Sequence, residues 1–238
     1  MAESFVLCLS ELNAFQTFIK VFLEQTVFDD QTSNIIDELS AMDCAMTTMK
    51  RSKMLQKFLK ITLKIGNFIN GGNYQGDASG FDLIFLTKLM DLRSNRKRHN
   101  MLHFVLNEFT TAEILEFLDE TKIYREASKI DPAAVKNQVN KLTTQLNDLK
   151  EQTKVEKISD FDDFFKIAIP KLEAVNAQEE SLDETTKKMT AFLYPGKKST
   201  PNKIRETLEI LATFGEQVET VKINQIKEIS NSLLYSDT

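Results

Sequence analysis

The sequence predicts an all-α protein, an elongated multi-helix bundle, on three observations. Apolar residues recur three and four positions apart through most of the 238 residues, which is the period of an amphipathic helix. No stretch of the sequence alternates apolar and polar residues between hairpin turns. Five of the seven glycines fall between Gly66 and Gly80, so the rest of the chain nearly lacks the residue that most disfavours helix.

The first long helix is predicted over residues 12–27, with Leu12, Phe15, Phe18, Ile19, Phe22 and Leu23 at helical spacing. The run Phe28-Asp-Asp-Gln interrupts this pattern, and Asp30 or Thr32 is predicted to cap a second helix that ends near Arg51.

Shorter elements follow. Ser52 is predicted to cap a third helix, whose apolar positions lead into the glycine window. A short helix is expected over residues 81–92, then a basic turn at 93–98. Another helix is expected over residues 100–109, and Thr111 is predicted to cap the next one.

The last part of the chain has long, polar-backed helices. Asp131-Pro132 is a strong helix start, because Asp caps and Pro fits the first helical position. A two-heptad seam follows at Val135, Val139, Leu142, Leu146 and Leu149. Such a short seam favours packing within the chain over an intermolecular coiled coil. Residues 161–192 are predicted to be helical around Pro170, and a final helix to start at Thr200-Pro201. We expect two regions, 1–130 and 131–238, the second packing back on the first.

Composition limits the classes of partner. The net charge is −5, so the chain is not expected to bind nucleic acid as a whole. Its apolar runs are too short for a membrane span or signal peptide, and a cytoplasmic protein is expected. Cys8 and Cys44 fall in apolar contexts, which predicts buried thiols instead of a disulfide or metal site. His103 is expected to be a hydrogen-bonded core residue. No catalytic or metal constellation is visible, and no cofactor is expected.

The glycine window itself allows three interpretations. A phosphate-binding loop needs a preceding strand and a Gly-Lys-Ser/Thr run, and both are missing. The second is a flexible connection between helices. The third is a packing site where small residues let another chain lie close to the backbone.

The residues of this window resemble a known family. Gly66-Asn-Phe-Ile-Asn70, followed by Gly80-Phe81, is similar to the Gly-Asn-Tyr-Met-Asn signature of the formin homology 2 domain. Further pieces agree in order and spacing: Leu83, Leu86, Lys88 and Leu89; Asp91-Leu-Arg-Ser94; Met101-Leu-His-Phe104; and Glu3-Ser-Phe5 with Leu7 and Leu9. Phe68, Ile69 and Arg93 depart from the family's Tyr, Met and Lys. The domain's lasso, linker and most of its knob precede the part that this sequence resembles, which is the post and coiled-coil region.

The resemblance implies a function in actin assembly. The family domain is a head-to-tail dimer in which the lasso of one subunit wraps the post of the other. This ring nucleates filaments and stays on their barbed ends. The residues that the resemblance assigns to lasso binding are Gly66, Asn67, Phe68, Asn70, Gly71, Gly80 and Phe81. Asn67 and Asn70 could instead simply cap the helix end.

Positive charge supplies the expected actin contact. Arg93, Arg96, Lys97 and Arg98 form a dense basic cluster in an acidic chain, and Lys88 lies in the matched run. Actin's surface is acidic, so this turn could attract it, although a solvated turn without a partner fits too. We expect an actin-binding module of a formin that is inactive without its lasso. The alternative is a helical scaffold for a non-actin partner, such as microtubules or a regulatory protein. Profilin binding is not expected, because the chain has no proline-rich segment.

Overall fold

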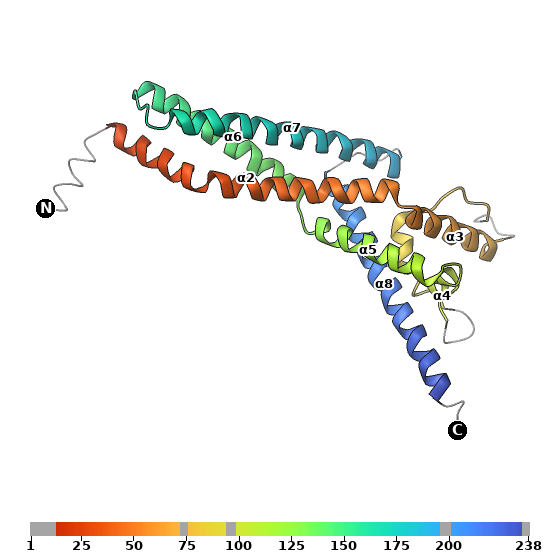
Figure 1. The fold of residues 1–238 in the computed structure, drawn as a ribbon. Helices are drawn as coiled ribbons and strands as arrows, with labels where there is room; N and C mark the ends of the chain where they lie inside the picture. Colours follow the sequence, from red (N-terminus) through yellow and green to blue (C-terminus); the bar gives the residue numbers. More distant parts are fainter. Residues whose placement is uncertain (1–12, 72–75, 94–98, 196–200, 235–238) are drawn as a thin grey trace. The chain divides into compact units, whose positions relative to one another are not determined.

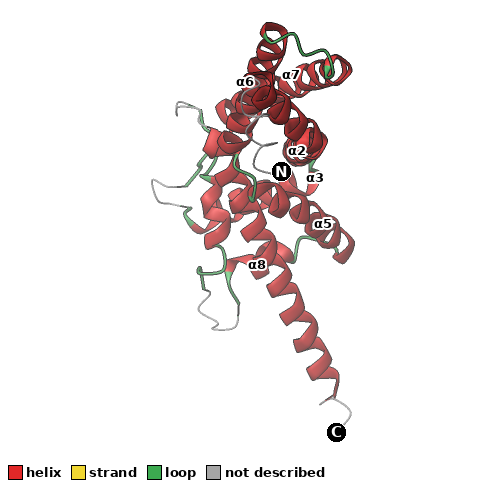
Figure 2. Ribbon diagram, turned by 90° about the vertical axis from the view of Figure 1, so that its left-hand side faces the viewer, coloured by secondary structure: helices red, strands yellow, loops and turns green. Residues whose placement is uncertain are grey.

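The computed structural model describes residues 13–71, 76–93, 99–195 and 201–234, with side chains for 14–71, 76–93, 99–195 and 202–226. These residues form helices joined by loops, as Figures 1 and 2 show, and the predicted all-α class is confirmed. The one extended pairing within the described ranges is an isolated antiparallel bridge between Arg93 and Asn100. No helix within these ranges is long and apolar enough to cross a bilayer.

The chain forms two compact units. The first contains Met1–Met42 and Asp131–Asn202, and the second contains Asp43–Ile130 and Lys203–Thr238. The first helix, α2 (Asn13–Arg51), contributes its beginning to the first unit and its end to the second.

The first unit consists of the beginning of α2 with α6 (Pro132–Val155) and α7 (Asp162–Leu193). Asp131 caps α6 as predicted, since its side chain accepts a hydrogen bond from the Ala133 N–H at 2.9 Å. Every residue of the predicted seam is buried within the chain: Val135, Val139, Leu142, Leu146 and Leu149. Aromatic pairs join α2 to the α7 side, with ring centroids of Phe28 and Phe164 5.6 Å apart.

The predicted break after residue 27 is wrong, because α2 is one continuous helix. Thr32 does not cap a new helix. Its hydroxyl donates to the carbonyl oxygen of Phe28 at 2.8 Å, one turn earlier in the same helix. Phe28 is buried against Phe164, and this packing keeps the two neighbouring aspartates on the solvent side. Tertiary packing therefore overrides the local capping pattern.

The second unit contains the end of α2 with α3 (Lys53–Ile69), the 3₁₀ helix η1 (Leu83–Lys88), α4 (Met101–Leu106), α5 (Thr111–Ser128) and α8 (Pro201–Leu234). Its core is phenylalanine-rich. The ring of Phe58 stacks on Phe109 at 4.0 Å and packs against Phe117 at 4.6 Å and Phe214 at 5.3 Å. Helices α3, α5 and α8 are therefore held by one aromatic cluster.

Local capping in this unit agrees with the sequence in one place and differs in another. Ser52 caps α3 as predicted, accepting from the Leu55 N–H at 2.8 Å. The cap of α5 is Thr110, not Thr111, because a capping box joins Thr110 to Glu113. Cys44 is exposed, which corrects the expected buried thiol, and Cys8 lies outside the described residues.

Candidate functional site

The end of α3 and the following loop are joined by one asparagine. Asn67 Nδ2 donates to the carbonyl oxygen of Ala78 at 2.9 Å, and the Ala78 N–H donates back to Asn67 Oδ1 at 3.0 Å. The side chain thus joins two residues eleven positions apart and closes the loop at its base. We call this pair of hydrogen bonds the Asn67–Ala78 clasp. Residues 72–75, inside this loop, lie outside the described part of the chain.

Asn70 has a different role. It is the C-cap of α3, and its own backbone N–H donates to the Gly66 carbonyl oxygen at 3.0 Å. Asn70 therefore caps the helix. The Asn67 side chain instead forms its hydrogen bonds with the loop, and not with the last carbonyl groups of the helix. Asp77, next to the clasped peptide, has a positive φ of 61°. Aspartate tolerates this left-handed conformation, and it turns the chain back toward Asn67.

The glycines of the window differ in how much space a side chain would have at each position. A Cβ built on Gly66 or on Gly80 would meet no atom within 4 Å. At Gly71 it would lie 3.2 Å from the Phe68 carbonyl oxygen, so this position is crowded by backbone. Contacts among the residues that the structure describes do not explain Gly66 and Gly80, and both positions leave room for an approaching group.

Two large apolar side chains at this end of α3 are not buried. Phe68 is 85% exposed and Ile69 is 62% exposed, so neither belongs to the core despite their position in the helical pattern. Ile84 of η1 is also exposed, while Phe81 is half-buried with its ring 5.8 Å from that of Phe85. The loop end of α3 therefore carries exposed apolar surface next to the Asn67–Ala78 clasp, which is typical of a protein-binding surface.

The predicted basic residues divide into described and undescribed ones. Lys88, at the end of η1, and Arg93 are both exposed. The bridge between Arg93 and Asn100 closes the basic turn, but Arg96, Lys97 and Arg98 lie outside the described residues. His103 lies at the base of this turn. It is half-buried and forms a capping box with Asn100, with 2.6 Å between His103 Nδ1 and Asn100 Oδ1. The expected hydrogen bonding is present, but the half-buried side chain does not belong to the core.

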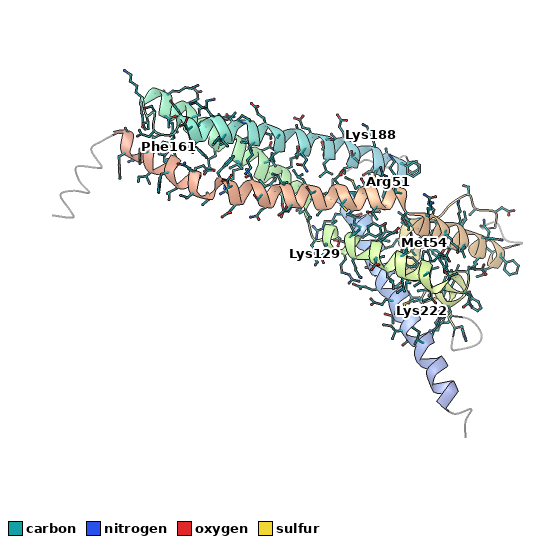
Figure 3. The ribbon with its side chains drawn as sticks, viewed as in Figure 1. Arg51, Met54, Lys129, Phe161, Lys188 and Lys222 are labelled. Carbon is teal, nitrogen blue, oxygen red and sulfur yellow. The ribbon has the colours of Figure 1, made fainter. Side chains whose placement is uncertain are left out.

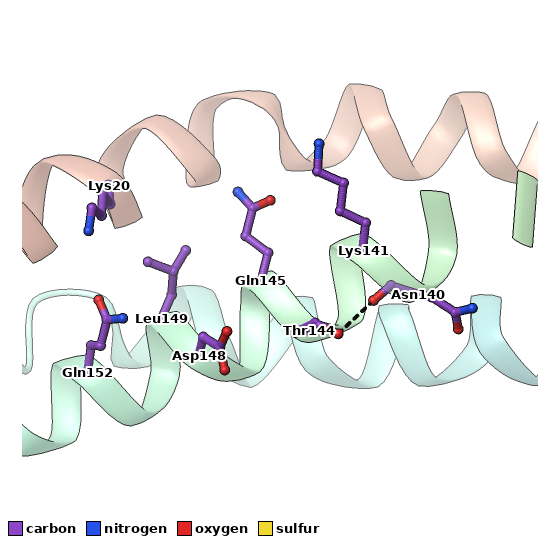
Figure 4. Close-up of a pocket in the computed structure, with 8 residues that line it drawn as sticks. All are labelled: Lys20, Asn140, Lys141, Thr144, Gln145, Asp148, Leu149 and Gln152. Atoms are coloured by element: carbon purple, nitrogen blue, oxygen red, sulfur yellow. Dashed lines mark hydrogen bonds between the residues drawn. The ribbon is translucent and has the colours of Figure 1, made fainter. Parts of the chain in front are cut away.

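The cavities of the structure do not define a chemical site. An open groove of about 510 Å³ runs between α2 and α6, and its lining residues are drawn in Figure 4. Lys141 and Gln145 point from α6 toward α2 in this view. Under the groove, Gln145 Nε2 donates to Glu24 Oε2 at 2.5 Å. Within the described residues, no cluster of three His, Cys, Asp or Glu side chains could hold a metal ion.

Burial raises the pKa of the Glu24 carboxyl, and the charge of Lys141 opposes this shift. A similar case occurs in the second unit, where burial raises the pKa of Glu120 although Ser52 Oγ donates to its Oε2 at 2.5 Å. Each of these carboxyls lies between packed helices and not in a cleft with a nucleophile. We therefore interpret both as structural groups.

Sequence reasoning missed two features. The Asn67–Ala78 clasp needs the loop geometry, which no spacing rule supplies. The second is a row of lysines on α3, described below, at spacings of four, three and four residues in a helix without any acidic residue. That spacing was readable from the sequence.

Comparison with known proteins identifies the family of this helical fold. The model of the Formin Homology 2 Domain matches residues 1–219, and the chain belongs to this family. It is 26% identical to human Protein diaphanous homolog 3 over 213 residues, covering 88% of this chain and 16% of that protein. It is 24% identical to mouse FH2 domain-containing protein 1 over 233 residues, covering 96% and 20%.

A more distant organism gives a similar result. The chain is 29% identical to Formin-F of Dictyostelium discoideum over 148 residues, which is 61% of this chain and 12% of that protein. The chain thus spans a fifth or less of the length of these relatives.

Proposed function

We propose that this chain is an actin-binding module of a formin. It would form part of the domain that nucleates filaments and processively caps their barbed ends as a dimer. Family membership supports this function, together with the exposed side chain of Phe68 beside the clasped loop. That exposure is the observation on which the proposal most depends, because a monomeric protein rarely leaves adjacent large apolar residues in water. A cytoplasmic, cytoskeletal location goes with this function.

The lasso-binding surface of the proposal is the loop end of α3. Phe68 and Ile69 supply apolar area, and the open space over Gly66 and Gly80 would admit a backbone. The clasp at Asn67 keeps the loop base in one position, so less conformational entropy is lost when a second chain binds. The occupant is the lasso segment of a partner subunit.

The actin-binding surface of the proposal is the basic turn with Lys88 and Arg93. Both described cations are exposed, and neither forms an ion pair within the described residues. Exposed positive charge on an acidic chain favours encounter with an acidic surface and makes binding salt-dependent.

Co-sedimentation with actin filaments across a salt series tests the actin contact. We expect the chain to pellet with filaments at low salt and to be released as salt rises. The double variant Lys88→Glu/Arg93→Glu should bind several-fold more weakly. Lys129→Glu/Lys154→Glu is the matched control, since it changes the net charge equally at other exposed positions. Equal losses in both variants would contradict a contact at the basic turn.

Polymerisation assays with light scattering test the assembly function. By itself the chain is expected not to accelerate polymerisation, because the family's activity needs a lasso on each post. Adding a fragment that contains a formin lasso should raise the measured mass, and Phe68→Ala should weaken this association. Acceleration by the chain alone at the level of an intact domain would refute the expected dependence on a lasso.

A further inference from the structure

Helix α3 carries a stripe of lysines that no acidic residue of its own helix balances. Lys53, Lys57, Lys60 and Lys64 occur at steps of four, three and four residues, which places them on one face. The 17-residue sequence of α3 contains no Asp or Glu. We call these four residues the α3 lysine stripe. Arg51, labelled with Met54 in Figure 3, lies just before it at the end of α2.

Several lysines elsewhere in the chain pair with an acidic residue three positions earlier. Lys122 pairs with Asp119, Lys129 with Glu126 and Lys154 with Glu151, at 2.7 to 2.8 Å. In the stripe, only Lys57 has an ion pair within the described residues, to Glu113 of α5 at 2.7 Å. Lys53, Lys60 and Lys64 are exposed and make none there.

This arrangement opposes the stability of α3. Like charges four residues apart repel, as between Lys53 and Lys57 and between Lys60 and Lys64. A cation in the first turn also faces the positive end of the helix dipole, and Lys53 is in that turn. The ion pair to Glu113 compensates Lys57, but Lys53, Lys60 and Lys64 have no such pair within the described residues. A local pattern that costs stability in this way is a reason to look for a binding function.

The surroundings of the stripe indicate what kind of partner fits. Helix α5 packs beside α3 and is acidic there: Glu113 pairs with Lys57, and Glu116 and Asp119 are exposed. A flat anionic membrane or a nucleic acid backbone would meet these carboxylates as well as the lysines. A narrow extended segment with acidic side chains would contact the lysines alone.

Length agrees with a short extended segment. Lys64 is eleven positions after Lys53, which is about 16 Å along the helix axis. About five residues of extended chain cover the same distance, with side chains on one side recurring about every 7 Å. Lys53, Lys60 and Lys64 lie about 10 and 6 Å apart along the axis, and their long, flexible side chains can reach carboxylates at that repeat.

We propose that the α3 lysine stripe binds an extended, glutamate- or aspartate-rich segment of a partner protein. Its carboxylates would pair with Lys53, Lys60 and Lys64, which make no ion pair within the described residues. Its residues differ from those of the basic turn at Arg93, and its existence does not depend on the actin proposal.

Fluorescence anisotropy with labelled deca-glutamate, and deca-glutamine as the neutral comparison, tests the site on the whole 238-residue chain. We expect salt-sensitive binding of deca-glutamate only. The triple variant Lys53→Gln/Lys60→Gln/Lys64→Gln should bind about tenfold more weakly, since each exposed ion pair contributes about two- to threefold. Its melting temperature should not fall, because the substitutions remove repulsion within α3.

The control variant is Lys122→Gln/Lys129→Gln/Lys154→Gln, which removes three exposed lysines from other helices and changes the net charge equally. It should keep nearly all of the peptide affinity. Equal weakening in both triple variants would overturn the proposal, because binding would then follow net charge. Absence of deca-glutamate binding by the unmodified chain would also overturn it, and so would binding to anionic lipid vesicles without binding to the peptide.

Discussion

Asn67 and Ala78 form a reciprocal pair, in which one side-chain amide both donates to and accepts from the same residue's backbone, at 2.9 and 3.0 Å. The pair holds the base of a glycine-rich loop against the end of α3. Because the amide uses its oxygen and its nitrogen together, no other residue type of this size reproduces both bonds. The family signature asparagine therefore has a structural role in the chain itself, beside any role toward a partner.

Replacing Asn67 should open the loop. Asn67→Ala removes both hydrogen bonds, and we expect a loss of about 1 kcal/mol because the pair is exposed to water. Hydrogen exchange at the Ala78 amide should become much faster. Asn67→Asp retains an acceptor for the Ala78 N–H, so it should preserve more of the protection. Unchanged exchange at Ala78 in the alanine variant would show that the clasp is not maintained in solution.

Gly215 is predicted to be indispensable for packing in the second unit. A Cβ at this position of α8 would lie 2.6 Å from Thr121 Cβ of α5. Gly215→Ala must therefore push the two helices apart, and we expect a destabilisation of about 1–3 kcal/mol in urea unfolding. Gly66→Ala is the matched control, because the added methyl meets nothing within 4 Å.

The control variant Gly66→Ala has its own expected effect on the free energy of unfolding. Alanine is the better helix former, so Gly66→Ala should leave stability unchanged or raise it by up to about 1 kcal/mol. Equal destabilisation by both substitutions would mean that the close approach of α5 and α8 at Thr121 is wrong.

Glu24 predicts a specific dependence of stability on pH. Burial raises the pKa of this carboxyl, with Lys141 opposing the shift. A carboxyl with a raised pKa binds its proton more tightly in the folded state than in the unfolded state. Its contribution to the free energy of unfolding is therefore present at low pH and is lost as pH rises through the folded pKa. Glu24→Gln keeps an acceptor for Gln145 and cannot ionise. The variant should therefore gain stability relative to the unmodified chain as pH rises from about 4.5 toward neutrality.

Urea unfolding at several pH values measures this difference. The control is Glu173→Gln, an exposed position on α7 of the same unit. Its difference from the unmodified chain should not grow with pH. If Glu24→Gln follows the control at every pH, then Glu24 is not desolvated between α2 and α6.

Local signals determined which features could be predicted from the sequence. Ser52 and Asp131 were found because a cap and its first turn are adjacent in the sequence. The apolar context of Cys44 predicts a buried thiol, but Cys44 is exposed because it does not keep the spacing of Met42, Met46 and Met49, which are buried. The break at Phe28 was wrong because the partner that buries this ring, Phe164, is far along the chain. Likewise, nothing near Asn67 in the sequence points to Ala78.

The seam on α6 gives a prediction about association. Leu146 is fully buried within the chain, so Leu146→Ala should destabilise the first unit by about 2–5 kcal/mol. Since the seam packs inside one chain, this loss should not depend on protein concentration. Leu115→Ala is the control, because Leu115 is 58% exposed on α5 and should change stability by less than about 0.5 kcal/mol. A melting temperature that rises with protein concentration in the unmodified chain, and no longer does so in Leu146→Ala, would instead assign the seam to a contact between chains.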